Sequence, residues 1–137
     1  MSFVLDSSVS LSWCFDDERT DATDALLERI VESGADAPAL WPLEVLNALA
    51  MAERRRRIDA EHRQRLAGFL CDLPVAIDEE TASQAWAVTA QLAARFRLTV
   101  YDAAYLELAQ RRGLPLATLD QELRAAAAAL GVTLLGT

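Results

Sequence analysis

Short apolar runs alternate with longer amphipathic stretches along the chain, and each pattern predicts a different element. The first run, residues 2–5, ends at Asp6 and is typical of a buried parallel strand. Similar short runs predict further strands within 36–39, 75–77, 115–118 and 132–135. Apolar positions at helical spacing predict helices over 9–14, 21–33, 41–56, 59–72, 79–96, 101–112 and 122–130. Strands that alternate with helices in this way indicate an α/β domain with a mainly parallel sheet.

The predicted helix over 41–56 carries an acid within an apolar stretch. One side of this helix is apolar and consists of Leu43, Leu46, Ala50 and Met51. Glu44 falls in the same stretch, so it is not expected to face solvent fully. Asn47 lies one turn beyond Glu44 and on the same side of the helix.

Composition narrows the class of protein. The chain has 137 residues, of which 53% are hydrophobic, and this suffices for the core of one ordinary domain. Its formal net charge is −8, all thirteen basic residues are arginine, and four of these form one block at 54–57. The acidic balance argues against a protein that binds nucleic acid by simple electrostatic attraction. The arginine block is either a solvated helix end or a local patch that contacts phosphate.

The chain carries no signal for export or membrane insertion. No basic residue precedes Arg19, and no uninterrupted apolar run approaches the roughly 20 residues that span a bilayer. Cys14 and Cys71 are far apart, and the single histidine, His62, completes no zinc-binding set with them. We therefore expect a cytoplasmic, soluble protein in which both cysteines are buried and reduced.

Four acidic residues occupy places where chemistry is expected in a parallel sheet. Asp6 and Asp120 follow predicted strands, Asp102 opens a helix, and Glu44 lies inside one. Taken singly, Asp102 and Asp120 could be helix caps and Glu44 an ordinary helix acid. If the four converge, their mutual repulsion requires neutralisation. Mg²⁺ or Mn²⁺ suits such an all-oxygen site, and two divalent ions would activate water and clamp a phosphodiester.

Other chemistries fit the sequence less well. His62 lies among charged residues and is a poor candidate for catalysis. The five glycines form no phosphate-binding loop. Phosphoaspartate chemistry would require a second Asp two residues after Asp6, where the chain has Ser8, and a receiver domain would require a lysine that the chain lacks.

Four segments together resemble PIN-domain ribonucleases, and specifically VapC-type toxins of toxin–antitoxin pairs. The first is Val-Leu-Asp-Ser-Ser-Val at 4–9, and the second is Leu-Glu-Val-Leu-Asn-Ala-Leu at 43–49. The third, 98–109, contains Tyr-Asp-Ala-Ala-Tyr and is the most specific, and the fourth is Leu-Ala-Thr-Leu-Asp at 116–120. The segments occur in the family's order and spacing, so the likeness covers essentially the whole chain.

The resemblance implies a fold, an activity and a set of partners. The fold would be a three-layer α/β/α sandwich with a mainly parallel central sheet, formed by residues 1–137 as a single PIN domain. The activity would be Mg²⁺- or Mn²⁺-dependent RNA cleavage. The partners would be RNA, a VapB-type antitoxin and a second copy of the chain in a homodimer. The family's catalytic, metal-binding acids correspond to Asp6, Glu44, Asp102 and Asp120, and supporting positions correspond to Ser7, Asn47 and Thr118.

Two other hypotheses stay open, a non-catalytic member of the same fold and a different metal enzyme. The protein could be a non-catalytic module that binds protein or RNA, or a structure-specific DNA nuclease, although such nucleases carry extra helices for which 137 residues leave little room. The large aromatic residues could fill the core or line an antitoxin groove. The core is expected for most of the set, with Trp13 and Trp41 as the exceptions among Trp13, Trp41, Phe69 and Trp86.

Overall fold

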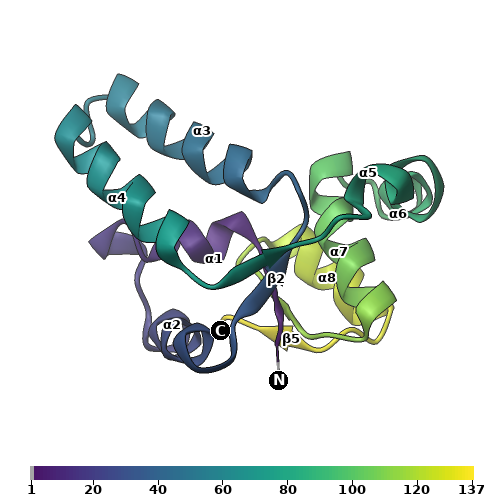
Figure 1. The fold of residues 1–137 in the computed structure, drawn as a ribbon. Helices are drawn as coiled ribbons and strands as arrows, with labels where there is room; N and C mark the ends of the chain where they lie inside the picture. The colour runs from purple at the N-terminus through teal and green to yellow at the C-terminus, as the bar shows by residue number, and fades with distance from the viewer. Residues whose placement is uncertain (1) are drawn as a thin grey trace.

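The computed structural model describes residues 2–137 and contains a five-stranded parallel sheet (Figure 1). The strand order is β3-β2-β1-β4-β5, and every neighbouring pair is parallel. The strands are β1 (Val4–Leu5), β2 (Ala35–Ala37), β3 (Val75–Ile77), β4 (Leu116–Ala117) and β5 (Leu134–Leu135). All five lie where apolar runs predicted them, so the predicted strands and the parallel sheet are confirmed.

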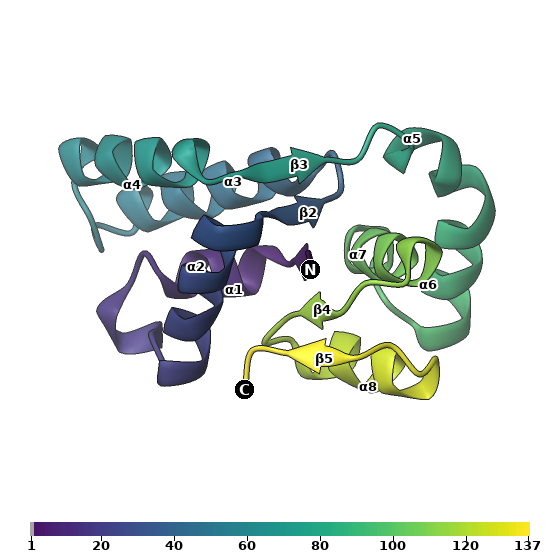
Figure 2. The same ribbon diagram turned by 60° about the horizontal axis from the view of Figure 1, so that its bottom comes forward.

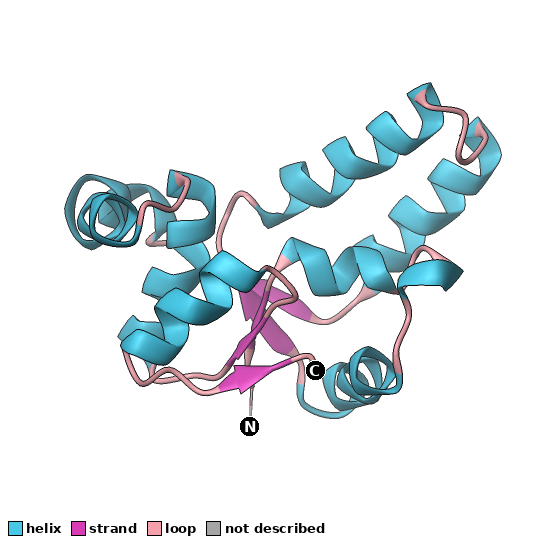
Figure 3. Cartoon of the chain, turned by 180° about the vertical axis from the view of Figure 1, so that it is seen from behind, coloured by secondary structure: helices cyan, strands magenta, loops and turns pink. Residues whose placement is uncertain are grey.

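Helices cover both faces of the sheet and complete three layers. Figure 2 shows α1–α4 on one side of the sheet and α6, α7 and α8 on the other, and Figure 3 shows the strands between them from behind. The helices are α1 (Ser7–Ser12), α2 (Asp21–Ser33), α3 (Trp41–Arg54), α4 (Ala60–Asp72), α5 (Thr81–Gln84), α6 (Ala90–Phe96), α7 (Val100–Arg112) and α8 (Gln121–Ala129). Two shorter elements are a 3-10 turn, η1 (Asp16–Glu18), and a π-type turn, η2 (Ala85–Thr89). The predicted α/β sandwich is therefore confirmed.

The predicted single helix over 79–96 is wrong, because the chain forms three consecutive elements there. Ala87 has φ −117° and ψ −105°, which interrupts the helix within η2. The interruption changes the direction of the helix. Thr89 and Leu92, which follow it, are buried, whereas Trp86, which precedes it, is 92% exposed. The sequence predicted correctly that this segment is helical. It did not predict the break at Ala87, which depends on how the segment packs against α7.

The buried side of α3 differs from the apolar side that the sequence analysis singled out. The side that packs in the core contains Trp41, Val45, Leu49 and Ala52, whereas Leu43 and Leu46 are 72% and 47% exposed. Because this helix has apolar residues on more than one side, periodicity alone does not choose the side that faces the sheet.

Aromatic and sulfur side chains are placed differently from the prediction as well. Trp13 and Trp41 are buried, and their indole N–H groups donate to the carbonyl of Thr23 (2.7 Å) and the hydroxyl of Ser10 (2.9 Å). Both therefore belong to the core, and the exposed tryptophan is Trp86. Cys14 is buried as predicted, but Cys71 is exposed, because it lines an open hollow between α3, α4 and β3. The predicted burial of Cys71 is wrong.

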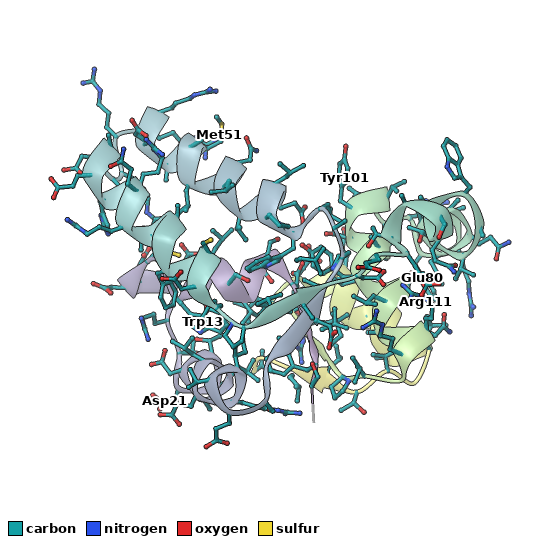
Figure 4. The ribbon with its side chains drawn as sticks, in the orientation of Figure 1. Trp13, Asp21, Met51, Glu80, Tyr101 and Arg111 are labelled. Carbon is teal, nitrogen blue, oxygen red and sulfur yellow. The ribbon has the colours of Figure 1, made fainter. Side chains whose placement is uncertain are left out.

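An ion-pair cluster joins the end of α7 to the segment that follows β3. Arg111 contacts Asp78 at 2.6 Å, Glu107 at 2.8 Å and Glu80 at 2.9 Å, and the carboxylates of Asp78 and Glu107 are almost fully buried. Figure 4 shows Arg111 and Glu80 close together on this side of the molecule. The cluster fixes the C-terminal end of the helix whose N-terminal end carries Asp102.

Candidate functional site

The carboxyl end of the sheet gathers the four predicted acids. Asp6 directly follows β1, and Asp120 lies three residues beyond β4, the strand that pairs with β1. Glu44 is in the first turn of α3 and Asp102 is in the first turn of α7. The charges of Asp6, Asp120 and Glu44 all raise the pKa of Asp102, so the four carboxylates lie within electrostatic reach of one another.

Asp6 is the buried centre of the group, with only 3% of its surface exposed. Two hydroxyl groups converge on one of its oxygens, Oδ2: Ser8 donates at 2.6 Å and Thr118 donates at 2.8 Å. Burial raises the pKa of Asp6, and these hydroxyls, together with the nearby N–H groups at the start of α1, oppose that rise. The predicted supporting residue Thr118 thus contacts Asp6 directly.

The same two hydroxyls tie Asp6 to the segment that carries Asp120. The Ser8 hydroxyl accepts from the backbone N–H of Leu119 at 3.0 Å, and the Thr118 hydroxyl accepts from that of Asp120 at 3.1 Å. Each hydroxyl therefore donates to Asp6 and accepts from the backbone beyond β4. This arrangement fixes the spacing between the first acid and the last.

Glu44 is half-buried and is held by a residue of α7. The hydroxyl of Tyr105 donates to Oε1 of Glu44 at 2.6 Å, and the Tyr105 side chain is fully buried. Burial is the main cause that raises the pKa of Glu44, and the charge of Asp6 adds to it, whereas the hydroxyls of Tyr105 and Ser7 lower it. The predicted supporting residue Ser7 therefore acts on Glu44.

Asp102 carries the clearest electrostatic signature of the site. Burial, and then the charges of Asp6, Asp120 and Glu44, raise its pKa to about 6. Asp102 is not the cap of α7, because that place belongs to Thr99, whose hydroxyl accepts from the backbone N–H of Asp102 at 3.1 Å. The Thr99 side chain also hydrogen-bonds to the Asp102 carboxylate and partly opposes the rise of its pKa.

Asp120 and Asn47 differ from the buried part of the site. The carboxylate of Asp120 accepts from the backbone N–H of Leu123 at 3.0 Å and caps α8. The sequence had predicted either this capping role or a role in metal binding. Asn47 is exposed one turn beyond Glu44. It lines an open hollow of about 410 Å³ together with Leu40, Leu43, Glu44 and Tyr101.

The donor chemistry of this group fits a hydrated divalent cation. Within residues 2–137, no three carboxylate, imidazole or thiol side chains are grouped closely enough to hold a metal ion by themselves. Mg²⁺ does not require such a group, because it keeps several waters and takes only one or two protein carboxylates directly. Carboxylates that raise the pKa of a neighbour by their charge are stabilised by a cation placed between them.

Two residues of this site were missed in the sequence. Ser8 was not predicted to support the site, although its hydroxyl contacts Asp6 directly. Tyr105 lies three residues after Asp102, which is the spacing of one helical turn, and that spacing was the available signal. Both residues act through contacts between distant segments, which a local pattern does not reveal.

Comparisons with known proteins agree with the fold. The crystal structure of PAE2754 from Pyrobaculum aerophilum has a TM-score of 0.69 and 24% sequence identity, over 92% of this chain and 84% of that one. The crystal structure of FitAcB from Neisseria gonorrhoeae has a TM-score of 0.67 and 17% identity, over 98% of this chain and 96% of that one. No curated protein is significantly similar in sequence. The family model for the PIN domain matches residues 3–129, which is nearly the whole chain, and the protein therefore belongs to the PIN domain family.

Proposed function

We propose that the protein is a metal-dependent endoribonuclease and the toxin of a VapBC-type toxin–antitoxin pair. PIN domains are typically nucleases, and this gives the reaction class. The observation that carries the proposal is the placement of the four acids at the carboxyl end of the sheet, where burial, and then the charges of the other three, raise the pKa of Asp102. A protein keeps four carboxylates together at a cost in stability, and a functional cation gives a reason for that cost.

In this proposal Asp6, Glu44, Asp102 and Asp120 hold Mg²⁺ or Mn²⁺ at the carboxyl end of the sheet. A divalent cation there would neutralise phosphate charge and favour ionisation of an attacking water. The chain's own groups supply the orientation: the hydroxyls of Ser8 and Thr118 fix one oxygen of Asp6, and Tyr105 fixes one oxygen of Glu44. Asp102 has a pKa near 6 and is therefore mostly ionised at neutral pH.

RNA is the proposed substrate in spite of the acidic balance of the chain. The arginine block at 54–57 contributes less positive charge than its sequence suggests, because Arg57 pairs with Asp17 and Glu18 and lies over the ring of Phe15. The other three arginines are exposed at the end of α3. In this proposal phosphate is attracted by a cation at the acidic site together with these three arginines.

Exposed apolar residues support the proposed protein partners, a VapB-type antitoxin and a second copy in a homodimer. Leu46 on α3 and Trp86 on η2 are large and solvent-exposed. An apolar hollow of about 250 Å³ lies between α3, α4 and β3. Such surfaces are typical of sites for other protein chains.

We also propose a cytoplasmic location. Within residues 2–137, no helix combines the length and the apolar character needed to cross a membrane.

Cleavage of total cellular RNA tests the proposed function. Purified protein is incubated with Mg²⁺, with Mn²⁺ or with EDTA, beside Asp102→Asn and beside Asp72→Asn, which removes an exposed acid of α4 in the same way. We expect discrete RNA fragments that require metal, persist in Asp72→Asn and disappear in Asp102→Asn.

Two outcomes would contradict the proposal. Cleavage that persists in EDTA would exclude the cation, and the absence of cleavage by folded protein would favour a binding module. A matched single-stranded DNA of the same sequence as a cleaved RNA separates a ribonuclease from a DNA nuclease.

A further inference from the structure

An open hollow continues directly from the acidic site, and the two share Glu44. Its volume is about 410 Å³, and its other lining residues are Leu40, Leu43, Asn47 and Tyr101. Tyr101 directly precedes Asp102 at the start of α7, whereas the other residues come from the start of α3. A ligand in this hollow would therefore lie beside the proposed reaction centre.

Tyr101 is the exposed aromatic residue of this hollow. Its side chain is 63% exposed, and Figure 4 shows it projecting from the N-terminal end of α7 on the side where α3 begins. Leu43 is 72% exposed on the facing helix. An aromatic ring opposite an aliphatic side chain forms a slot that suits a flat, apolar group.

Polar groups border the same slot. Asn47 is exposed and offers both an amide donor and a carbonyl acceptor. This combination recognises the edge of a nucleobase, while a ring such as that of Tyr101 stacks on its face. Stacking does not depend on positive charge, which matters in a chain with a net charge of −8.

A second protein chain fits this hollow less well than a nucleobase does. Five residues line it, whereas a stable protein interface takes about 20–30 residues a side. The smaller but more apolar hollow between α3, α4 and β3 is a separate place for such a contact.

We propose that Tyr101, Leu43 and Asn47 form a subsite for one unpaired nucleobase next to the phosphate at the acidic site. The inference rests on the proposed ribonuclease function and deepens it. The substrate is then single-stranded at the cut, because a base within a duplex has no free face to stack on Tyr101.

Binding and cleavage of a short single-stranded RNA test the subsite. Fluorescence anisotropy of labelled RNA, in Ca²⁺ so that cutting does not interfere, gives the affinity of wild type, Tyr101→Ala, Tyr101→Phe and Trp86→Ala. We expect about tenfold weaker binding for Tyr101→Ala and less than a twofold change for Tyr101→Phe, because phenylalanine still stacks. Trp86→Ala removes an exposed aromatic residue elsewhere and should bind like wild type.

Kinetics and an abasic substrate extend the test. In Mg²⁺, Tyr101→Ala should raise KM about tenfold and change kcat less. A substrate with a single abasic position at the subsite should bind wild type as weakly as the intact RNA binds Tyr101→Ala.

The outcomes separate this proposal from the proposed function. If wild type cuts RNA and Tyr101→Ala matches it in affinity and KM, the subsite is wrong while the ribonuclease stands, and the exposed ring belongs to a protein contact. If wild type binds RNA through Tyr101 without cutting, the ribonuclease is wrong and the subsite stands. If folded wild type binds no RNA, both are wrong.

Discussion

The hydroxyl of Tyr105 donates a 2.6 Å hydrogen bond to Oε1 of Glu44, and this contact joins α7 to α3 across the acidic site. Tyr105 is fully buried and lies one turn beyond Asp102 on the same helix. The position of Glu44 relative to Asp102 is therefore set by one helix and one hydrogen bond.

Replacing this tyrosine should loosen Glu44 without removing it. We expect Tyr105→Phe to lower the free energy of unfolding by about 1–2 kcal/mol, because a hydrogen bond to a charged group is lost. Mn²⁺ should bind about tenfold more weakly, as residues that orient metal ligands contribute on this scale. Urea unfolding and calorimetric titration with Mn²⁺ measure the two effects.

Tyr101→Phe is the matched control for that change. It removes a hydroxyl from an exposed tyrosine on the same helix and should leave Mn²⁺ affinity and stability unchanged. Equal Mn²⁺ affinity in Tyr105→Phe and wild type would show that the hydroxyl does not orient a ligand.

In the metal-free protein, ionisation of Asp102 should lower the free energy of unfolding as pH rises. Its pKa is raised from 3.8 to about 6 by folding, so the folded state binds the proton more tightly between those values. The free energy of unfolding in EDTA should therefore fall from about pH 4 to about pH 6. Asp78 has a lowered pKa, so its effect has the opposite sign and appears only as pH drops below about 4.

Urea unfolding at several pH values from 4.5 to 7.5 measures this effect. Asp102→Asn should flatten the fall, because the amide does not ionise, and saturating Mg²⁺ should restore stability near neutral pH. An identical fall in wild type and Asp102→Asn would assign it to other carboxylates.

Ser8 should matter to both stability and metal binding. Ser8→Ala removes the donor to Asp6 and the acceptor for the Leu119 N–H, and it should cost about 1–3 kcal/mol of unfolding free energy. Mn²⁺ affinity should fall tenfold or more, because Asp6 and the segment beyond β4 lose a shared partner. Ser83→Ala, in which an exposed hydroxyl contacts only its own turn, is the control. A Ser8→Ala protein as stable as Ser83→Ala would disprove the bridging role.

Arg111 should be the most costly ion-pairing residue to remove. Arg111→Met leaves the buried carboxylates of Asp78 and Glu107 without their main partner, which costs about 3–5 kcal/mol. Arg65→Met breaks a pair with Glu61 in which both side chains are largely exposed, and it should cost less than about 0.5 kcal/mol. Urea unfolding measures the loss of unfolding free energy in each variant. Similar losses would show that the ion pairs of Arg111 contribute no more than an exposed pair.

The sequence by itself determined the order of the elements and the places of the acids along it. Short apolar runs marked β1, β3, β4 and β5, because strands that pack against helices consist mainly of apolar residues, whereas β2 has Asp36 in its middle and was placed only approximately. Asp6 and Asp120 could be placed at the carboxyl end of the sheet, because parallel strands end at one edge. The metal-binding role of the four acids stays a prediction.

Only the tertiary structure decided which sides and contacts the elements use. The buried side of α3, the break at Ala87 and the exposure of Trp86 depend on how each helix packs against its neighbours. The contacts of Ser8 with Asp6 and of Tyr105 with Glu44 follow from the same packing. Periodicity is a property of one segment, whereas such contacts join segments far apart in the chain and exist only after the helices have packed on the sheet.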